Sequence, residues 1–120
     1  MVGRSGCGKS TLLRCIGGLI APTTGSIKIS GQIVTEPHPQ IGYVFQQPVL
    51  LPWRTVEANV SLPFEVKGKP TKEEKNKVKK VLGIVGLSDY AKHRPGELSG
   101  GMQQRVSVSR SLVTEPSILL

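Results

Sequence analysis

A glycine-rich segment near the start of the chain, GRSGCGKST at residues 3–11, fits the pattern G-x-x-x-x-G-K-[ST]. Glycines at this spacing let successive backbone N–H groups turn inward around phosphate oxygens, and the helix that follows adds the partial positive charge of its N-terminus. Lys9 would reach the outer phosphates, Ser10 would offer its hydroxyl to Mg²⁺, and Thr11 would bind an inner phosphate. The residues expected to bind a nucleotide are Gly3, Ser5, Gly6, Cys7, Gly8, Lys9, Ser10 and Thr11.

A second glycine cluster, LSGGMQQR at residues 98–105, lies directly before a predicted helix. Ser99, Gly100 and Gly101 would leave bare backbone N–H groups and a serine hydroxyl at the helix N-terminus, which favours an anion although no lysine is present. Taken alone, the same residues are equally typical of a plain helix cap with flexible glycines. The cluster by itself leaves both interpretations open.

Hydrophobic periodicity and turn residues predict an α/β core that carries an inserted helical subdomain. Thr55 is expected to cap one helix and Pro63 to break it, while Thr71 and Glu74 form a capping box at the start of a lysine-rich helix. We expect one core part at 1–55, the helical subdomain at 56–100, and a last helix and strand at 101–120. Further helices are predicted at 10–17, 56–62, 89–93 and 102–114, and strands at 26–30, 32–34, 41–45 and 117–120.

The formal net charge of +8 is compatible with binding to nucleic acid or to anionic lipid. Much of this charge lies in residues 67–80. Apolar residues recur at helical spacing from Val78 to Val85, so the lysines are predicted to form the solvated face of a helix. Aromatic residues make up only 4%, which argues against a nucleic-acid surface built by base stacking. The chain has no apolar run near the roughly 20 residues of a membrane span and opens with no signal peptide, so we expect it on the cytosolic side.

Taken together and in this order, the motifs resemble those of the ABC transporter ATPases. Residues 3–11 look like the Walker A motif of that family, and residues 98–105 match its signature motif almost letter for letter. Between them, VFQQPVLLPWRTVEANV at residues 44–60 resembles the family's Q-loop region, with Gln46 as the Q-loop glutamine. The Leu51-Pro52-Trp53 version of this loop is most similar to importers of the nitrate, sulfonate and taurine group.

The resemblance implies a P-loop NTPase fold of the ABC type, working as a head-to-tail homodimer that binds ATP and Mg²⁺. Ser99 and Gly101 would contact the γ-phosphate of a nucleotide held by the partner's Lys9, with Gly100 between them. Gln46 would be the catalytic residue of this stretch, helping Ser10 to position Mg²⁺ and orienting the attacking water. Residues 50–53 would dock on transmembrane permease subunits, which places the protein peripherally on the cytoplasmic face of the plasma (inner) membrane.

By the same resemblance, the family's early strands are expected before the first residue and its hydrolytic acids just beyond the last, so the fold is predicted to be truncated at both ends. In the family, the strand after the signature helix ends in an Asp that holds Mg²⁺ and a Glu that polarises water. Glu115 precedes the predicted strand, and His38 and His93 lie in the wrong places to act as the family's switch histidine. We therefore expect ATP hydrolysis from the parent protein and little from a chain of these 120 residues alone.

Other functions compatible with the motifs are an ATP-dependent clamp of the ABC type that does not transport, and a remnant that binds ATP without hydrolysing it. A nucleic-acid binder that uses its lysines is disfavoured, because no binding motif of that kind is present. The transported solute is not encoded in these residues, since other subunits choose it.

Overall fold

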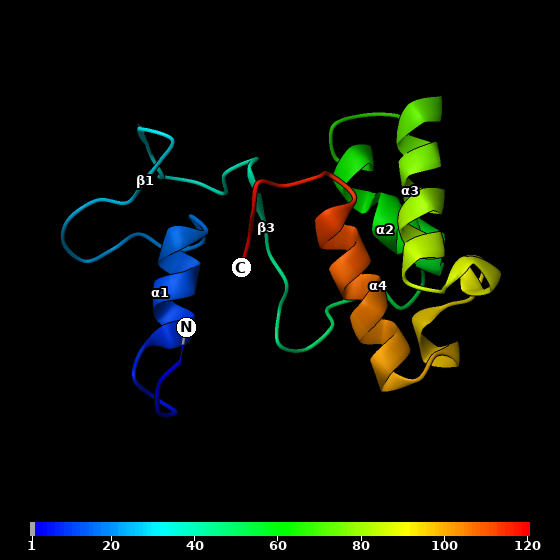
Figure 1. The fold of residues 1–120 in the computed structure, drawn as a ribbon, viewed down its shortest axis with the longest axis horizontal. Coiled ribbons are helices and arrows are strands. Elements are labelled where there is room, and N and C mark those ends of the chain that lie inside the picture. Colours follow the sequence, from blue (N-terminus) through cyan, green and yellow to red (C-terminus); the bar gives the residue numbers. More distant parts are fainter. Residues whose placement is uncertain (1) are drawn as a thin grey trace.

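The computed structural model describes residues 2–120, which form an elongated body of 46 × 33 × 23 Å. The glycine-rich loop at residues 3–8, helix α1 and a small hairpin lie at one end, and helices α2, α3 and α4 lie at the other (Figure 1). Strands β3 and β4 run between the two ends. The elements are α1 (Lys9–Ile16), β1 (Lys28–Ile29), β2 (Gln32–Ile33), β3 (Ile41–Gly42), α2 (Val56–Glu65), α3 (Lys72–Ile84), η1 (Ser88–Tyr90), η2 (Pro95–Glu97), α4 (Gly100–Leu112) and β4 (Ile118–Leu119).

The strands predicted at 26–30 and 32–34 are present but shorter, as the antiparallel pair β1–β2, in which Lys28 lies opposite Ile33. Ser30 and Gly31 connect the two strands with φ angles of 49° and 81°. A two-residue turn with positive φ at both positions matches the twist of the strands that it joins. Ile29 faces inward and is buried, as the alternation of apolar residues predicted.

Strands β3 and β4 form a parallel pair although the whole helical part of the chain separates them, with Ile41 opposite Ile118 and Gly42 opposite Leu119. The Val44 N–H donates to the Leu120 carbonyl at 2.8 Å, which extends the pairing beyond the regular strands. Gly42 is required here because a Cβ atom would lie 2.7 Å from the Ser111 carbonyl oxygen. The strands predicted at 41–45 and 117–120 are thus confirmed but shorter.

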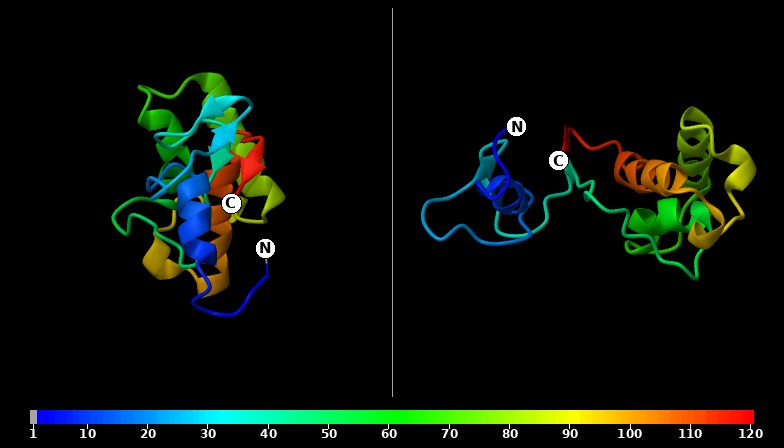
Figure 2. Two further views of the ribbon diagram at one scale, coloured as in Figure 1. Left: turned by 90° about the vertical axis from the view of Figure 1, so that its left-hand side faces the viewer. Right: turned by 90° about the horizontal axis from the view of Figure 1, so that it is seen from below.

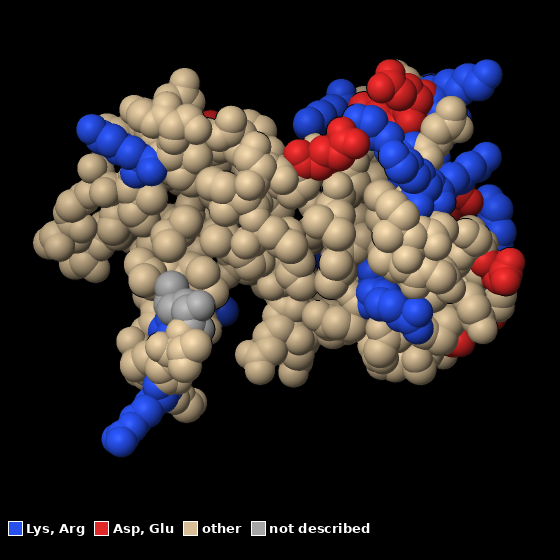
Figure 3. Space-filling model, in the orientation of Figure 1, with Lys and Arg blue, Asp and Glu red and all other residues tan. Residues whose placement is uncertain are grey.

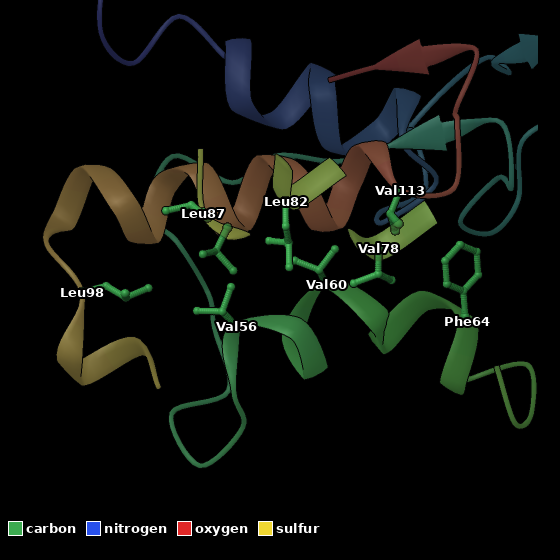
Figure 4. Close-up of a cluster of buried hydrophobic side chains, with 9 residues drawn as sticks. Val56, Val60, Phe64, Val78, Leu82, Leu87, Leu98 and Val113 are labelled. Atoms are coloured by element: carbon green, nitrogen blue, oxygen red, sulfur yellow. The ribbon is translucent and has the colours of Figure 1, made fainter. Parts of the chain in front are cut away.

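The hydrophobic core lies in the helical end of the molecule, where α2, α3 and α4 pack together (Figure 4). Val78 and Leu82 of α3 are buried, which confirms the predicted apolar face of the lysine-rich helix. The core is completed by Val56, Val60, Phe64, Leu87, Leu98, Val106 and Val113. By contrast, the other end buries only Ile29 and Val34 among its large apolar side chains in the described residues.

Helix caps follow the sequence closely. The Ala58 N–H donates to the Thr55 hydroxyl at 3.2 Å, which satisfies a donor that the first turn of α2 leaves free. At α3 the Glu74 N–H donates to the Thr71 hydroxyl, and the Thr71 N–H donates to the Glu74 carboxylate at 2.8 Å. Both predicted caps are therefore confirmed, including the reciprocal capping box.

The predicted helix boundaries differ from the structure, most clearly in three helices. Helix α2 continues through Pro63 to Glu65, because a proline in the last turn removes only one late hydrogen bond. The helix predicted at 89–93 is the 3₁₀ turn η1, which begins at Ser88. Helix α4 begins at Gly100 rather than at residue 102, because the Ser99 hydroxyl caps it by accepting from the Met102 N–H.

Charged side chains gather over the helical end, where lysines of α3 project into solvent (Figure 3). Lys72, Lys75, Lys79 and Lys80 are all exposed, as expected for the solvated face of an amphipathic helix.

Among residues 2–120, helices that are both long enough and apolar enough to cross a bilayer are absent.

Candidate functional site

The glycine-rich loop forms the turn that the sequence pattern predicts, and it leads directly into α1. Gly6 and Gly8 have φ angles of 80° and 89°, a conformation that glycine adopts without the steric cost paid by other residues. Gly8 is the N-cap of α1, and in the described part of the chain no side chain caps this end. The backbone N–H groups of the first turn, at Lys9 and Ser10, are consequently available to an anion at the helix N-terminus.

The Lys9 ammonium group lies over this loop. Its Nζ donates to the carbonyl oxygens of Gly3 and Arg4, both at 2.6 Å, and lies 3.4 Å from the Cys7 Sγ. Gly3 leaves space for this arrangement, because a Cβ atom there would lie 2.9 Å from the Cys7 Sγ. The loop therefore gathers one positive charge and the positive end of a helix dipole at the same point.

A hollow of about 520 Å³ opens at the N-terminus of α1. Its lining contains residues that are far apart in the sequence, since Gln46 joins the loop from the segment that follows β3. The lining residues are Gly3, Ser5, Gly6, Gly8, Lys9, Ser10, Thr11 and Gln46. These are the residues predicted from the glycine-rich loop and the Q-loop, with the exception of Cys7. The Cys7 sulfur faces Lys9 instead.

Gln46 is brought to the hollow by packing between β3 and α1. Gly17 at the end of α1 lies so close to Tyr43 that a Cβ atom would be 3.2 Å from its ring. The Tyr43 and Phe45 rings pack against each other with centroids 4.7 Å apart. These contacts hold the segment that carries Gln46 beside the first turn of α1, next to Ser10.

The second glycine cluster lies elsewhere. Ser99, Gly100 and Gly101 are exposed at the N-terminus of α4, and they are not part of the lining of the hollow. In Figure 1 the glycine loop lies in the end of the molecule that carries α1 and the N-terminus of α4 lies in the helical end, both at the lower edge, and Figure 2 shows the same separation. Within one chain, then, the two predicted anion sites do not meet.

The segment at residues 50–53 presents an apolar side chain to solvent. Trp53 is 69% exposed and neighbouring Val49 is 57% exposed, whereas Leu50 packs against the hydrophobic core.

The polar residue that supports this segment, Asn59 of α2, was missed by the sequence analysis. Its only signal in the sequence is that asparagine, a weak helix former, stands beside Val60 on the face of α2 that is buried.

The sequence model described as "ABC transporter" matches residues 1–120, which is the whole chain. The chain belongs to the ABC transporter family. The resemblance stated from the motifs is thereby confirmed.

Curated members of the family include importer subunits. The chain is 48% identical over 119 residues to the nitrate import ATP-binding protein NrtD of Synechocystis sp., a match that covers 99% of the chain and 45% of NrtD. It is 45% identical over 128 residues to the methionine import ATP-binding protein MetN of Brucella abortus, covering all of the chain and 35% of MetN. The chain thus spans less than half the length of these curated relatives.

A solved ABC structure has the same fold. It is the dimeric, post-hydrolysis state of an ATP-binding cassette bound to ADP and Pi. The match has a TM-score of 0.84 and 38% sequence identity, and it covers 98% of the chain and 56% of that protein. The predicted fold class, a P-loop NTPase of the ABC type with helices inserted in it, is confirmed. The division at residues 55 and 100 stays a prediction.

Proposed function

We propose that this chain is the ATP-binding, energy-coupling part of an ABC importer ATPase. The observation that carries the proposal is the hollow at the N-terminus of α1, where the glycine loop, Lys9 and Gln46 meet. A phosphate chain fits such a site because backbone N–H groups, a helix N-terminus and an ammonium group all stabilise negative charge. The importer relatives and the ADP-bound cassette support the same conclusion.

Each residue around the hollow has a proposed role. Lys9 would contact the outer phosphates, and the loop from Gly3 to Gly8 would surround them with N–H groups. Ser10 and Gln46 line the same hollow and offer a hydroxyl and an amide oxygen, which are the hard oxygen ligands that Mg²⁺ prefers. Phosphate oxygens would complete the coordination of the ion. Bound Mg²⁺ would neutralise charge on the phosphates, and Gln46 would orient water beside them.

The separation of the two glycine clusters supports a head-to-tail dimer. Ser99 and Gly101 are exposed at the α4 N-terminus, so they are free to approach a nucleotide held by the partner's Lys9. A Cβ atom added to Gly100 or Gly101 would meet no other part of the described chain within 4 Å, which leaves room for a close approach. We propose that ATP hydrolysis in such a dimer drives transport.

The membrane partner is proposed to bind at residues 50–53. Trp53 and Val49 are large apolar side chains left in solvent, as expected for a surface that another protein covers. This contact would hold the ATPase peripherally on the cytoplasmic face of the membrane, with no role for nucleic acid. Nitrate and methionine import proteins are similarly close relatives, so the solute is left unassigned.

The proposal is tested by ATP binding to Lys9→Met, with Lys28→Met as the matched control. Lys28 is exposed on β1 and does not line the hollow. Lys9→Met removes the ammonium group that would face the phosphates. ATP binding should weaken by roughly tenfold or more, because hydrogen bonds to charged groups contribute more binding free energy than neutral ones. Isothermal titration with ATP and Mg²⁺ measures this directly. Equal ATP affinity in both variants would overturn the assignment of the hollow.

A further inference from the structure

We propose that Asn59 is a positioning residue that holds residues 51–54 as a preformed turn and thereby presents Trp53 to the membrane subunit. This inference rests on the proposed docking role of that segment. It adds a residue that the sequence motifs did not single out. The reason lies in the environment of the Asn59 side chain.

Asn59 is fully buried in α2, with an exposed fraction of 0%, and its helix neighbours Val56 and Val60 are equally buried. A primary amide in such a place is costly unless its donors and acceptor are paired. All the side-chain partners of Asn59 are backbone groups that precede it in the chain. Its amide is therefore used to hold backbone in place.

The amide binds both ends of one turn. Its Oδ1 accepts from the Leu51 N–H at 2.8 Å, and its Nδ2 donates to the carbonyl oxygens of Leu51 at 3.1 Å and Arg54 at 3.2 Å. A further contact of Nδ2, to the Thr55 carbonyl at 3.0 Å, lies within the start of the same helix. One side chain thus fixes the residue that begins the turn and the residue that ends it.

The turn itself points Trp53 outward. The Arg54 N–H donates to the Leu51 carbonyl at 3.1 Å, which closes a four-residue turn with Pro52 in its second position. Proline suits this position because its φ angle is already fixed near the required value. Trp53 occupies the third position and is 69% exposed. The Arg54 side chain also pairs with Glu65 at the end of α2.

A surface held in one conformation binds a partner with less loss of conformational entropy than a mobile loop does. Without the Asn59 amide, the Leu51 N–H and the Arg54 carbonyl would lose their protein partners and turn toward water. The core contacts of Val56 and Val60 would still hold α2. The expected consequence is a loosened turn with a weakened docking surface and an unchanged nucleotide site.

The experiment compares Asn59→Ala, the isosteric Asn59→Asp and the control Asn76→Ala, in the full-length protein. Asn76 is an exposed asparagine on α3. Trp53 is the single tryptophan of these 120 residues. Once any other tryptophan of the full-length protein has been removed, the fluorescence anisotropy of Trp53 measures the mobility of the turn. Amide hydrogen exchange at Leu51 reports the bond to Oδ1, and titrations measure binding of ATP and of the cognate membrane subunits in detergent.

Asn59→Ala should speed exchange at Leu51 by roughly tenfold, lower the Trp53 anisotropy, and weaken binding to the membrane subunits by roughly tenfold. Asn59→Asp keeps an acceptor but loses both donors, so Leu51 should stay protected while Trp53 becomes mobile. ATP affinity should stay within about twofold of the parent protein in every variant, because Asn59 does not line the nucleotide hollow.

Wild-type exchange at Leu51 and wild-type Trp53 anisotropy in folded Asn59→Ala would overturn the proposal. Unchanged binding to the membrane subunits despite a loosened turn would overturn its docking part. If the parent protein does not bind membrane subunits at all, the proposed importer function fails instead, and the exchange data still decide whether Asn59 holds the turn.

Discussion

Gly18 shows how one residue sets the path of the chain in the end of the molecule that carries the glycine-rich loop. It follows α1 with a φ angle of 72°, and its N–H donates to the Cys15 carbonyl at 3.1 Å. A Cβ atom at this position would lie only 2.1 Å from the Glu36 carbonyl oxygen. The end of α1 and the loop before β3 can approach each other this closely only because position 18 has no side chain.

We predict that Gly18→Ala is strongly destabilising, whereas Gly25→Ala is mild. Gly25 has a similar φ angle of 77°, but within the described residues no atom lies within 4 Å of its Cβ position. Gly25→Ala should cost about 1–2 kcal/mol from backbone strain alone, and Gly18→Ala at least about 3 kcal/mol because backbone must also move. Urea denaturation of both variants measures the difference. Equal losses would show that the Glu36 contact is not rigid.

At the scale of elements, α3 is held by its apolar face. Leu82 is 1% exposed in the cluster with α2 and α4, while Ile84 on the same helix is 74% exposed. Leu82→Ala should cost about 2–5 kcal/mol through lost burial and the cavity left behind. Ile84→Ala should stay within about 0.5 kcal/mol of the parent protein. Thermal or chemical unfolding of the two variants checks this, and similar losses would contradict the packing described for α3.

Local sequence rules predicted elements whose causes are local. Thr55 and Thr71 cap helices through backbone groups three residues away, so the chain itself contains the whole signal. Asn59 was missed because its backbone partners lie four to eight residues earlier in the chain, beyond the three-residue span of the capping rules. The effect of Pro63 was misjudged because a proline breaks a helix in its interior but is tolerated near its end. Packing of Phe64 in the core extends α2 beyond Pro63.

The candidate site was predictable to a similar extent. The glycine loop and Lys9 follow from one continuous motif, and Gln46 was assigned by resemblance, with the structure bringing it to the same hollow. Cys7 was placed in the nucleotide site by its position in the motif, yet its sulfur turns toward Lys9. Side-chain direction within a loop depends on backbone angles such as those of Gly6 and Gly8, which a motif does not specify.

At the scale of the molecule, Lys77 and Glu115 join α3 to the turn before β4 by a hydrogen bond of 3.0 Å. This hydrogen bond and the charge of Lys77 lower the pKa of Glu115 from its ordinary value of 4.5. They likewise raise the pKa of Lys77 above its ordinary value of 10.5. The Glu115 side chain is 69% exposed and the Lys77 side chain 34% exposed, so solvent screens the pair, which should be weak and sensitive to salt.

The direction of the pH dependence follows from these shifts. Because the pKa of Glu115 is lowered by folding, its contribution to stability is present above pH 4.5 and is lost as pH falls through the lowered pKa. The contribution of Lys77 is present below pH 10.5 and is lost as pH rises through the raised pKa. The stability difference between the parent protein and Glu115→Gln should therefore be constant at neutral pH and shrink in acid.

Unfolding free energies measured across this pH range at low salt check the prediction. Lys77→Met should abolish the same pH-dependent difference, because it removes the partner of Glu115. A difference that persists unchanged below the lowered pKa would mean that Glu115 does not act through the ion pair with Lys77.

The parallel pairing of β3 with β4 has a consequence for how the chain reaches its native state. Ile41 meets Ile118 only after the whole segment between them has been ordered, and closing so long a loop is slow. The contacts among α2, α3 and α4 span shorter distances in the sequence, so these helices should assemble first. During synthesis on the ribosome, β3 emerges long before β4, and its edge must wait unpaired while the helices form. That waiting period is when this chain is most exposed to aggregation, and a chaperone would have most to protect.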